Sequence, residues 1–297
     1  MISKSFSQAV VIAVLLGTAA PVAAGPLEDA NAAASFGDFA TAIPLFRTLA
    51  EQGNSYAQYS LGIMYVKGQG VTQDYTEGMK WIRLAAEKGL VIAQTDLAIM
   101  LRRGWGGARD STEAAIWYRR AAEQDSVVAQ SGLGDMYAVG EGATQDFAQA
   151  FKWYSRAADH DSPYAQNLLG IAYQHGLSVR QNDDEAFRWY RRAANNLYDF
   201  STLTLIHGPQ YNLALMYASG RGVPKDNVQA YMWFTLAARF GDIRSPTAQG
   251  ISIFSTPKET SIEQCNRLAA QMTSAEIAKG KQLAAEWAPH PILSVRP

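Results

Sequence analysis

The chain has 297 residues, with 26 Lys or Arg against 27 Asp or Glu, so its formal charge is −1. This balance lacks the concentrated basic face that nucleic-acid binding needs, and we expect no nucleic-acid partner. Cys265 is the only cysteine, which excludes an internal disulfide. Its helically spaced neighbours Ile262, Leu268 and Met272 favour a buried apolar role over a reactive thiol or an intermolecular link.

Residues 1–24 have the pattern of a secretory signal peptide. Lys4 precedes an apolar run from Ala9 to Ala20, and small residues follow up to Gly25, so we expect cleavage after Ala24. The run is about 12 residues long, whereas a membrane helix needs about 20. No cysteine follows it to carry a lipoprotein anchor. The sequence therefore predicts a periplasmic or secreted chain with no membrane span after cleavage, and with a formal charge of −2 once Lys4 is removed.

A tryptophan followed four and five residues later by alanines recurs five times, at Trp81, Trp117, Trp153, Trp189 and Trp233. The spacings of 36, 36, 36 and 44 residues mark an internal repeat. The pattern predicts a degenerate N-terminal capping repeat at 25–56, with helices near 27–36 and 39–53. Five units follow, at 57–92, 93–128, 129–164, 165–208 and 209–242. We therefore expect an all-α solenoid of helix-turn-helix repeats.

Each unit is predicted to open with a helix whose second residue is glutamine, whose fifth is leucine and whose sixth is small. The small residue indicates close crossing by a neighbouring helix, since the distance between helix axes depends on side-chain size. This first helix ends at a Gly-x-Gly pair, with Gly176 and Ser178 as the degenerate copy. A phosphate-binding loop is the alternative, but no strand precedes the glycines and no Lys-Ser/Thr follows them.

The second helix of each unit is predicted to begin at an Asp or Asn cap with Glu or Gln three residues later: Asp74, Asp110, Asp146, Asn182 and Asp226. A catalytic acid pair is the alternative for any one copy, but five copies favour helix starts. The tryptophans, their neighbours and the alanine pairs are predicted to form the core, as are the methionines of the first helices. A carbohydrate-stacking platform is the alternative for the tryptophans.

The C-terminal part departs from the repeat, as solenoid ends do. Residues 243–260 are predicted to be a loop, and 261–288 to form two capping helices. Ser261 with Gln264, and Thr273 with Glu276, are the predicted capping boxes of these helices. Residues 289–297 are predicted to be a flexible tail.

The motif beginning Ala57-Gln58 and running through Leu61, Tyr65 and Gly68-x-Gly70 to Trp81 resembles the Sel-one-like repeat, a relative of the tetratricopeptide repeat. The resemblance extends over about residues 27–241 and is closest in 57–89 and 129–161. It implies a right-handed α/α superhelical solenoid that binds proteins or peptides. Exported members include regulators of sensor kinases and envelope adaptors. Cysteine-rich members linked with β-lactam hydrolysis carry paired cysteines that this chain lacks.

Two regions are candidate partner sites. In related solenoids the first helices line a concave groove, so we expect contacts from variable positions of these helices. The candidates are Tyr59, Lys67, Asp96, Arg103, Asp135, His175 and Asn212. The second region is the eight-residue insertion within 195–208, which either folds onto the stack or presents a hydrophobic site. Its candidates are Tyr198, Phe200, Leu203 and Leu205.

The leading hypothesis is a periplasmic or secreted scaffold for a protein or peptide partner. The first alternative is an enzyme acting on the cell wall or on β-lactams, but the four histidines stand outside any nucleophile motif or metal-ligand spacing. We therefore expect no catalytic residues, no metal and no cofactor. The second alternative is a glycan-binding module, which requires tryptophans that face water.

Overall fold

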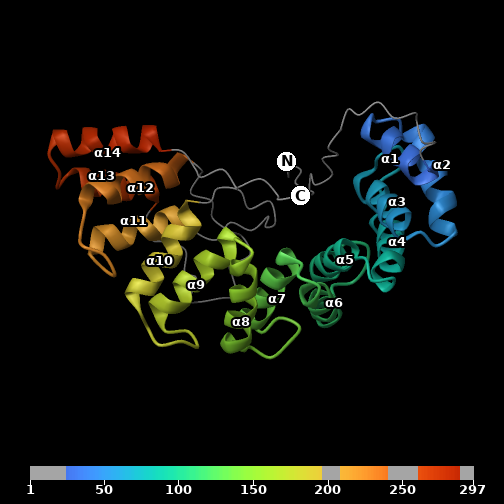
Figure 1. The fold of residues 1–297 in the computed structure, drawn as a ribbon, viewed down its shortest axis with the longest axis horizontal. Coiled ribbons are helices and arrows are strands. Elements are labelled where there is room, and N and C mark those ends of the chain that lie inside the picture. The colour runs from blue at the N-terminus through green and yellow to red at the C-terminus, as the bar shows by residue number, and fades with distance from the viewer. Residues whose placement is uncertain (1–24, 196–207, 240–259, 288–297) are drawn as a thin grey trace. The chain divides into compact units, whose positions relative to one another are not determined.

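The computed structural model describes residues 25–195, 208–239 and 260–287 (Figure 1). These residues form fourteen helices and no strand, so the prediction of an all-α solenoid is confirmed. The predicted signal peptide, the core of the insertion, most of the 243–260 loop and the C-terminal tail lie outside the described residues. None of the described helices has the length and apolarity needed to cross a membrane.

The helices form consecutive pairs, and a short connection joins the two helices of each pair. The N-terminal capping pair is α1 (Pro26–Ser35) and α2 (Phe39–Glu51). The first helices of the repeats are α3 (Ser55–Lys67), α5 (Val91–Arg103), α7 (Val127–Val139), α9 (Pro163–His175) and α11 (Pro209–Ser219). The second helices are α4 (Tyr75–Glu87), α6 (Ser111–Glu123), α8 (Phe147–Asp159), α10 (Asp183–Ala194) and α12 (Asn227–Arg239). The C-terminal pair is α13 (Ser261–Ala269) and α14 (Ser274–Glu286).

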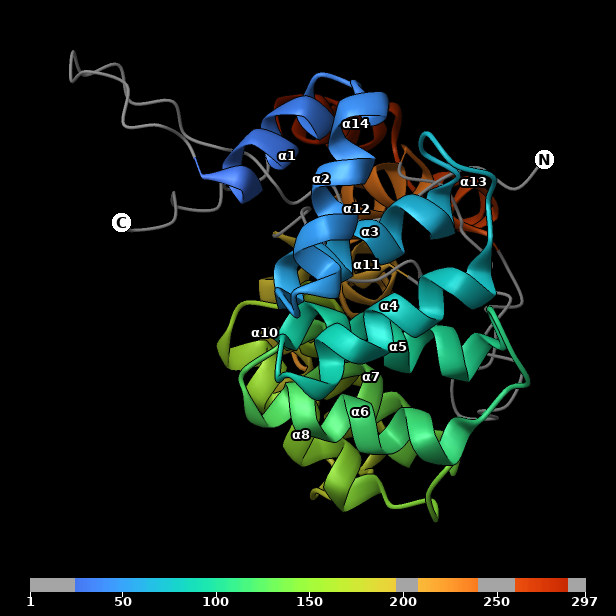
Figure 2. The same ribbon diagram turned by 90° about the vertical axis from the view of Figure 1, so that its right-hand side faces the viewer.

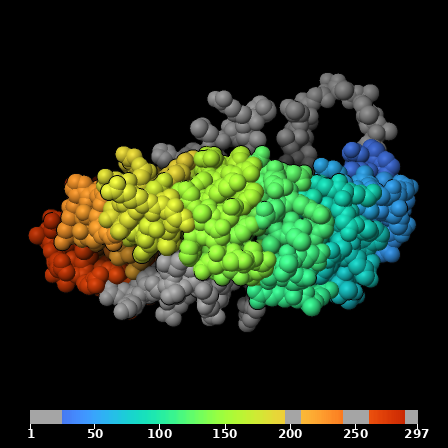
Figure 3. Space-filling model, turned by 90° about the horizontal axis from the view of Figure 1, so that it is seen from below, coloured from blue at the N-terminus to red at the C-terminus, as the bar shows by residue number. Residues whose placement is uncertain are grey.

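The helices belong to two compact units. In its described part, the N-terminal unit contains residues 25–133 and 141–144, and the C-terminal unit contains 134–140 and everything from 145 onward. Figure 2 shows α1 to α6 of the N-terminal unit lying one after another in chain order. In the C-terminal unit the same order appears as successive colour bands in Figure 3.

The predicted glycine turns have two distinct roles. The first glycine of each pair ends its helix in the left-handed conformation, as at Gly104 with φ 71°. The second glycine packs against the first residue of the preceding second helix. A Cβ on Gly106 would lie 2.3 Å from the Tyr75 carbonyl oxygen, and one on Gly222 would lie 2.1 Å from that of Asp183. In the degenerate copy, Ser178 itself takes φ 60°.

The predicted capping residues accept backbone hydrogen bonds at the starts of the second helices. Asp74, for example, accepts from the backbone N–H groups of Thr76 and Glu77. At α14 the capping box of Thr273 and Glu276 is confirmed. At α13 the prediction is wrong by one residue, because Thr260 is the cap and Glu263 its partner.

The repeated glutamine connects consecutive repeats. Its Nε2 donates to the carbonyl of the second alanine in the preceding pair, at 3.0 Å from Gln58 to Ala50 and 3.1 Å from Gln94 to Ala86. Gln130, Gln166 and Gln210 do the same. This buried side chain therefore sets how each first helix sits on the helix before it.

Two of the repeated glutamines in the N-terminal unit, Gln58 and Gln94, predict different mutational effects. Gln94 Oε1 accepts from Gln124, whereas the buried Gln58 Oε1 has no hydrogen-bond partner among the described residues. Gln94→Met loses two hydrogen bonds and should lower the free energy of unfolding by about 1–2 kcal/mol. Gln58→Met also removes an unsatisfied oxygen and should change it by less than about 0.5 kcal/mol. Thermal unfolding of both variants measures the difference, and equal losses would contradict this account.

The predicted core is confirmed for most of its aromatic and methionine residues. Trp117, Trp153 and Trp233 are each 5% exposed, while Trp81 and Trp189 are half-buried. The methionines of the first helices are buried. The small sixth residue receives the ring or branched side chain that follows the tryptophan, since a Cβ on Gly170 would lie 2.5 Å from the Tyr190 ring.

The C-terminal helices α13 and α14 close the end of the C-terminal unit by packing on α12. Trp287 stacks edge-on against Trp233 with ring centroids 5.9 Å apart, and Arg239 donates to the Ala284 carbonyl. Cys265 is half-buried beside the Tyr231 carbonyl and the Thr235 hydroxyl. On α12, Met232 and Leu236 are buried.

Candidate interaction surface

Two of the predicted groove residues bond to each other across neighbouring first helices. Tyr59 of α3 donates its hydroxyl to Asp96 of α5 at 2.7 Å, within the N-terminal unit. Burial raises the pKa of Asp96 to about 6, against the opposing effects of the Tyr59 hydrogen bond and the Lys67 charge. Burial and the adjacent Asp96 charge also raise the pKa of Tyr59. This pair therefore joins α3 to α5 side by side.

Two further predicted residues have similar roles in the C-terminal unit. Asp135 accepts from the hydroxyls of Tyr154 at 2.9 Å and Tyr164 at 2.7 Å. Asn212 of α11 donates to the buried Asn167 of α9 at 2.9 Å. These variable positions stabilise contacts between helices, so their side chains are engaged within the chain.

Lys67 and Arg103 are the exposed cations of the predicted set in the N-terminal unit. Each is the last residue of its first helix, in equivalent positions of neighbouring repeats. The Arg103 guanidinium lies 4.9 Å from the centre of the Trp105 ring. Both charges are accessible to a partner.

Neighbouring cations of the same unit are already compensated by an acid. Glu141 accepts from Arg102 Nε at 2.9 Å, from Arg109 and from the Ser111 hydroxyl. Burial raises the pKa of Glu141, but these hydrogen bonds and charges outweigh burial and hold that pKa below its usual value. Arg102 and Arg109 therefore form ion pairs within the chain.

The structure adds residues that the sequence analysis missed. Tyr56 and Ile92 lie at helical spacing from Lys67 and Arg103, nearer the starts of α3 and α5. They are 61% and 40% exposed. Extending the variable positions by one helical turn would have found both. We define the α3/α5 face as the eight residues on these two stripes: Tyr56, Ser60, Ile63, Lys67, Ile92, Asp96, Ile99 and Arg103.

His175 occupies the position equivalent to Lys67 and Arg103 in the C-terminal unit and is exposed. Partial burial and the Arg221 charge lower its pKa, while Asp183 opposes them. Arg221 itself binds Asp183 through two hydrogen bonds, at 3.1 and 2.8 Å. The remaining predicted residues, Tyr198, Phe200, Leu203 and Leu205, lie outside the described residues.

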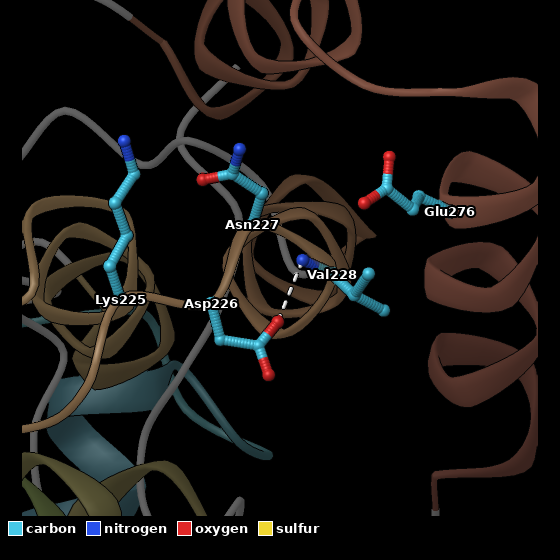
Figure 4. A pocket seen from close by; sticks show the side chains of 5 residues that line it. All are labelled: Lys225, Asp226, Asn227, Val228 and Glu276. Carbon is cyan, nitrogen blue, oxygen red and sulfur yellow. Dashed lines mark hydrogen bonds between the residues drawn. The ribbon is translucent and has the colours of Figure 1, made fainter.

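A cleft at the start of α12 and the first turn of α14 is polar and shallow (Figure 4). It is lined by Lys225, Asp226, Asn227, Val228 and Glu276. Asp226 and Glu276 already accept hydrogen bonds from helix N-termini, at Val228 and Thr273. This cleft therefore brings no nucleophile and base together. Across residues 25–195, 208–239 and 260–287, no three His, Cys, Asp or Glu side chains gather where they could hold a metal.

The repeat geometry agrees with a comparison against protein-family models. The Sel1 repeat model matches five stretches, at residues 55–90, 91–126, 127–162, 163–196 and 210–242. The chain belongs to the Sel1 repeat family. Its repeats begin at the N-termini of the first helices and include the Gly-x-Gly turn and the tryptophan helix. Sel1 repeats generally form non-enzymatic scaffolds for protein–protein interaction.

Solved structures share this fold. A protective antigen of uropathogenic Escherichia coli with an SLR fold is 34% identical, with a TM-score of 0.62. The alignment covers 82% of this chain and 51% of the antigen, so the chain spans about half of that protein. A Sel1 repeat protein from Oxalobacter formigenes is 28% identical, with a TM-score of 0.66 and coverage of 82% and 98%. No protein of curated function matches the sequence.

Proposed function

We propose that this Sel1 repeat chain is an exported scaffold that binds a protein or peptide partner on the α3/α5 face, in the periplasm or outside the cell. The observation that carries the proposal is that recurring and variable residues occupy different positions on α3 and α5. The residues that recur in every repeat are buried between helices, including Gln58, Leu61 and Gln94. The ends of the α3/α5 face are exposed and carry side chains that differ between repeats. Export is supported by the signal pattern of residues 1–24.

The test is crosslinking in the native cells followed by mass spectrometry, with the chain tagged at its C-terminus. The informative variant is Lys67→Glu/Arg103→Glu, because both side chains are exposed at the last residue of their helices. The matched control is Lys80→Glu, a reversal on exposed Lys80 of the second helix α4.

We expect the native chain and the Lys80→Glu control to capture the same partner. The double variant should capture at least about ten-fold less of this partner. Reversing both charges would replace complementary charges across the interface with like charges, which disfavour binding. Circular dichroism must show that the double variant keeps its helices. Undiminished capture by this variant would place the partner elsewhere, and capture of no partner by the native chain would count against the scaffold itself.

A further inference from the structure

Asp96 carries the one carboxyl group of the α3/α5 face, and it lies in the middle of that face. It is four residues from Ile92 and seven from Arg103, so the three side chains share one side of α5. These spacings correspond to about 6 Å and about 10 Å along the helix axis. Asp96 is half-buried in the chain by itself. A partner that contacts both ends of the face therefore covers the Asp96 carboxyl.

Two groups of α3 act directly on this carboxyl. The Tyr59 hydroxyl donates to its Oδ2 at 2.7 Å, and the Lys67 charge favours its ionised form. Burial has the larger and opposite effect, and it raises the pKa of Asp96 to about 6. Asp96 therefore changes its charge in mildly acidic solution. Lys67 then loses its favourable interaction with that charge.

Charged side chains of the other elements around α5 interact with groups other than Asp96. On α4, α5 and α6 the ion pairs are Lys80 with Glu77, Arg83 with Glu113, and Arg102 with Glu141. The Arg103 guanidinium lies over the Trp105 ring. The part of α7 in this unit, residues 127–133, has no titratable side chain. The groups that face Asp96 are therefore Tyr59 and Lys67.

We propose that a partner seated on the α3/α5 face completes the burial of the Asp96 carboxyl, so that binding takes up a proton there and strengthens in mildly acidic solution. The inference rests on the proposed function and names how that site is regulated. Covering a carboxylate removes water from it and disfavours its charge. The partner charge that complements Lys67 and Arg103 is negative and acts in the same direction.

Both effects raise the pKa of Asp96 in the complex above its value of about 6 in the chain by itself. A group with a higher pKa in the complex binds a proton from solvent as the complex forms. Binding is therefore tightest below about pH 6 and weakens as the pH rises above it. An increase of about one pKa unit makes binding up to about ten-fold tighter in acid.

The test uses the partner captured in the crosslinking experiment, produced on its own and fluorescently labelled. Its affinity is measured at about pH 5 and about pH 7.5 for three proteins. These are the native chain, Asp96→Asn, and the control Glu87→Gln, which removes an exposed acid of α4. Circular dichroism at both pH values checks that each protein keeps its helices.

The quantity compared is the affinity at about pH 5 divided by that at about pH 7.5. Titrating groups of the partner affect all three proteins alike. The ratio for the native chain and for Glu87→Gln should exceed that for Asp96→Asn by about five- to ten-fold. At about pH 7.5 the Asp96→Asn variant should bind more tightly than the native chain, because asparagine stays neutral and still accepts from Tyr59.

A second measurement follows the proton itself. In weakly buffered solution near about pH 6.5, formation of the native complex should take up about half a proton more than formation of the Asp96→Asn complex. Equal affinity ratios for the native chain and Asp96→Asn, or equal proton uptake, would overturn the inference and leave the scaffold standing. Capture of no partner would count against the scaffold and the inference together, so the two failures are distinguishable.

Discussion

Gly106→Ala should destabilise the N-terminal unit by about 3 kcal/mol, whereas Gly89→Ala should destabilise it by about 1 kcal/mol. Both glycines have positive φ, 84° at Gly106 and 90° at Gly89, so alanine is strained at either position. They differ in surroundings. A Cβ on Gly106 would lie 2.3 Å from the Tyr75 carbonyl oxygen, while a Cβ on Gly89 would meet nothing within 4 Å.

The pair separates two contributions that a single substitution would mix. Gly89→Ala measures backbone strain alone, and the excess loss at Gly106 measures the close approach of the turn to the first residue of α4. Thermal and urea unfolding of the two variants provide the comparison. Similar losses at the two positions would mean that the second glycine of the turn is needed only for its backbone conformation.

Asp96→Asn should stabilise the protein by about 2 kcal/mol at pH 7.5 and have almost no effect near pH 4. Burial raises the pKa of Asp96 from 3.8 to about 6, so the folded protein disfavours the charged carboxylate. Its contribution to stability is therefore full below about pH 4 and is lost as pH rises through about 6. Asparagine stays neutral and still accepts from the Tyr59 hydroxyl.

The measurement is the thermal midpoint of the native chain and of Asp96→Asn between pH 4 and 8. The difference between the two proteins must be used, because Glu113 and Glu141 have lowered pKa values and give the opposite pH dependence. Tyr59 and Lys67 of α3 are the groups that affect Asp96. A difference that does not change with pH would mean that Asp96 titrates normally in the folded protein.

Local signals in the sequence were sufficient for most of the fold. The helix starts at Asp74 and Asp110 and the helix end at Gly104 depend on residues within one or two turns, and these predictions are confirmed. The α13 start was misplaced because Thr260 and Ser261 both suit a cap, with Glu263 and Gln264 both suiting its partner.

The candidate surface was harder to predict because it depends on how neighbouring repeats superpose. Tyr59 and Asp96 are 37 residues apart, and nothing in either repeat alone shows that they bond to each other. Positions that vary between repeats were expected to be available to a partner. The polar groups of Asp135 and Asn212 instead form hydrogen bonds within the chain. Lys67 and Arg103 are exposed because long charged side chains at helix ends reach solvent.

The most direct test of the scaffold places a photo-crosslinking amino acid at Ile92 of the α3/α5 face and, in a second strain, at Leu84 of α4. The two side chains have nearly equal exposure, 40% and 41%, and lie in the same unit. On illumination of cells, the account predicts a discrete adduct of higher mass from position 92 and none from position 84. Adducts from position 84 alone, or from neither position, would contradict a partner site on the α3/α5 face.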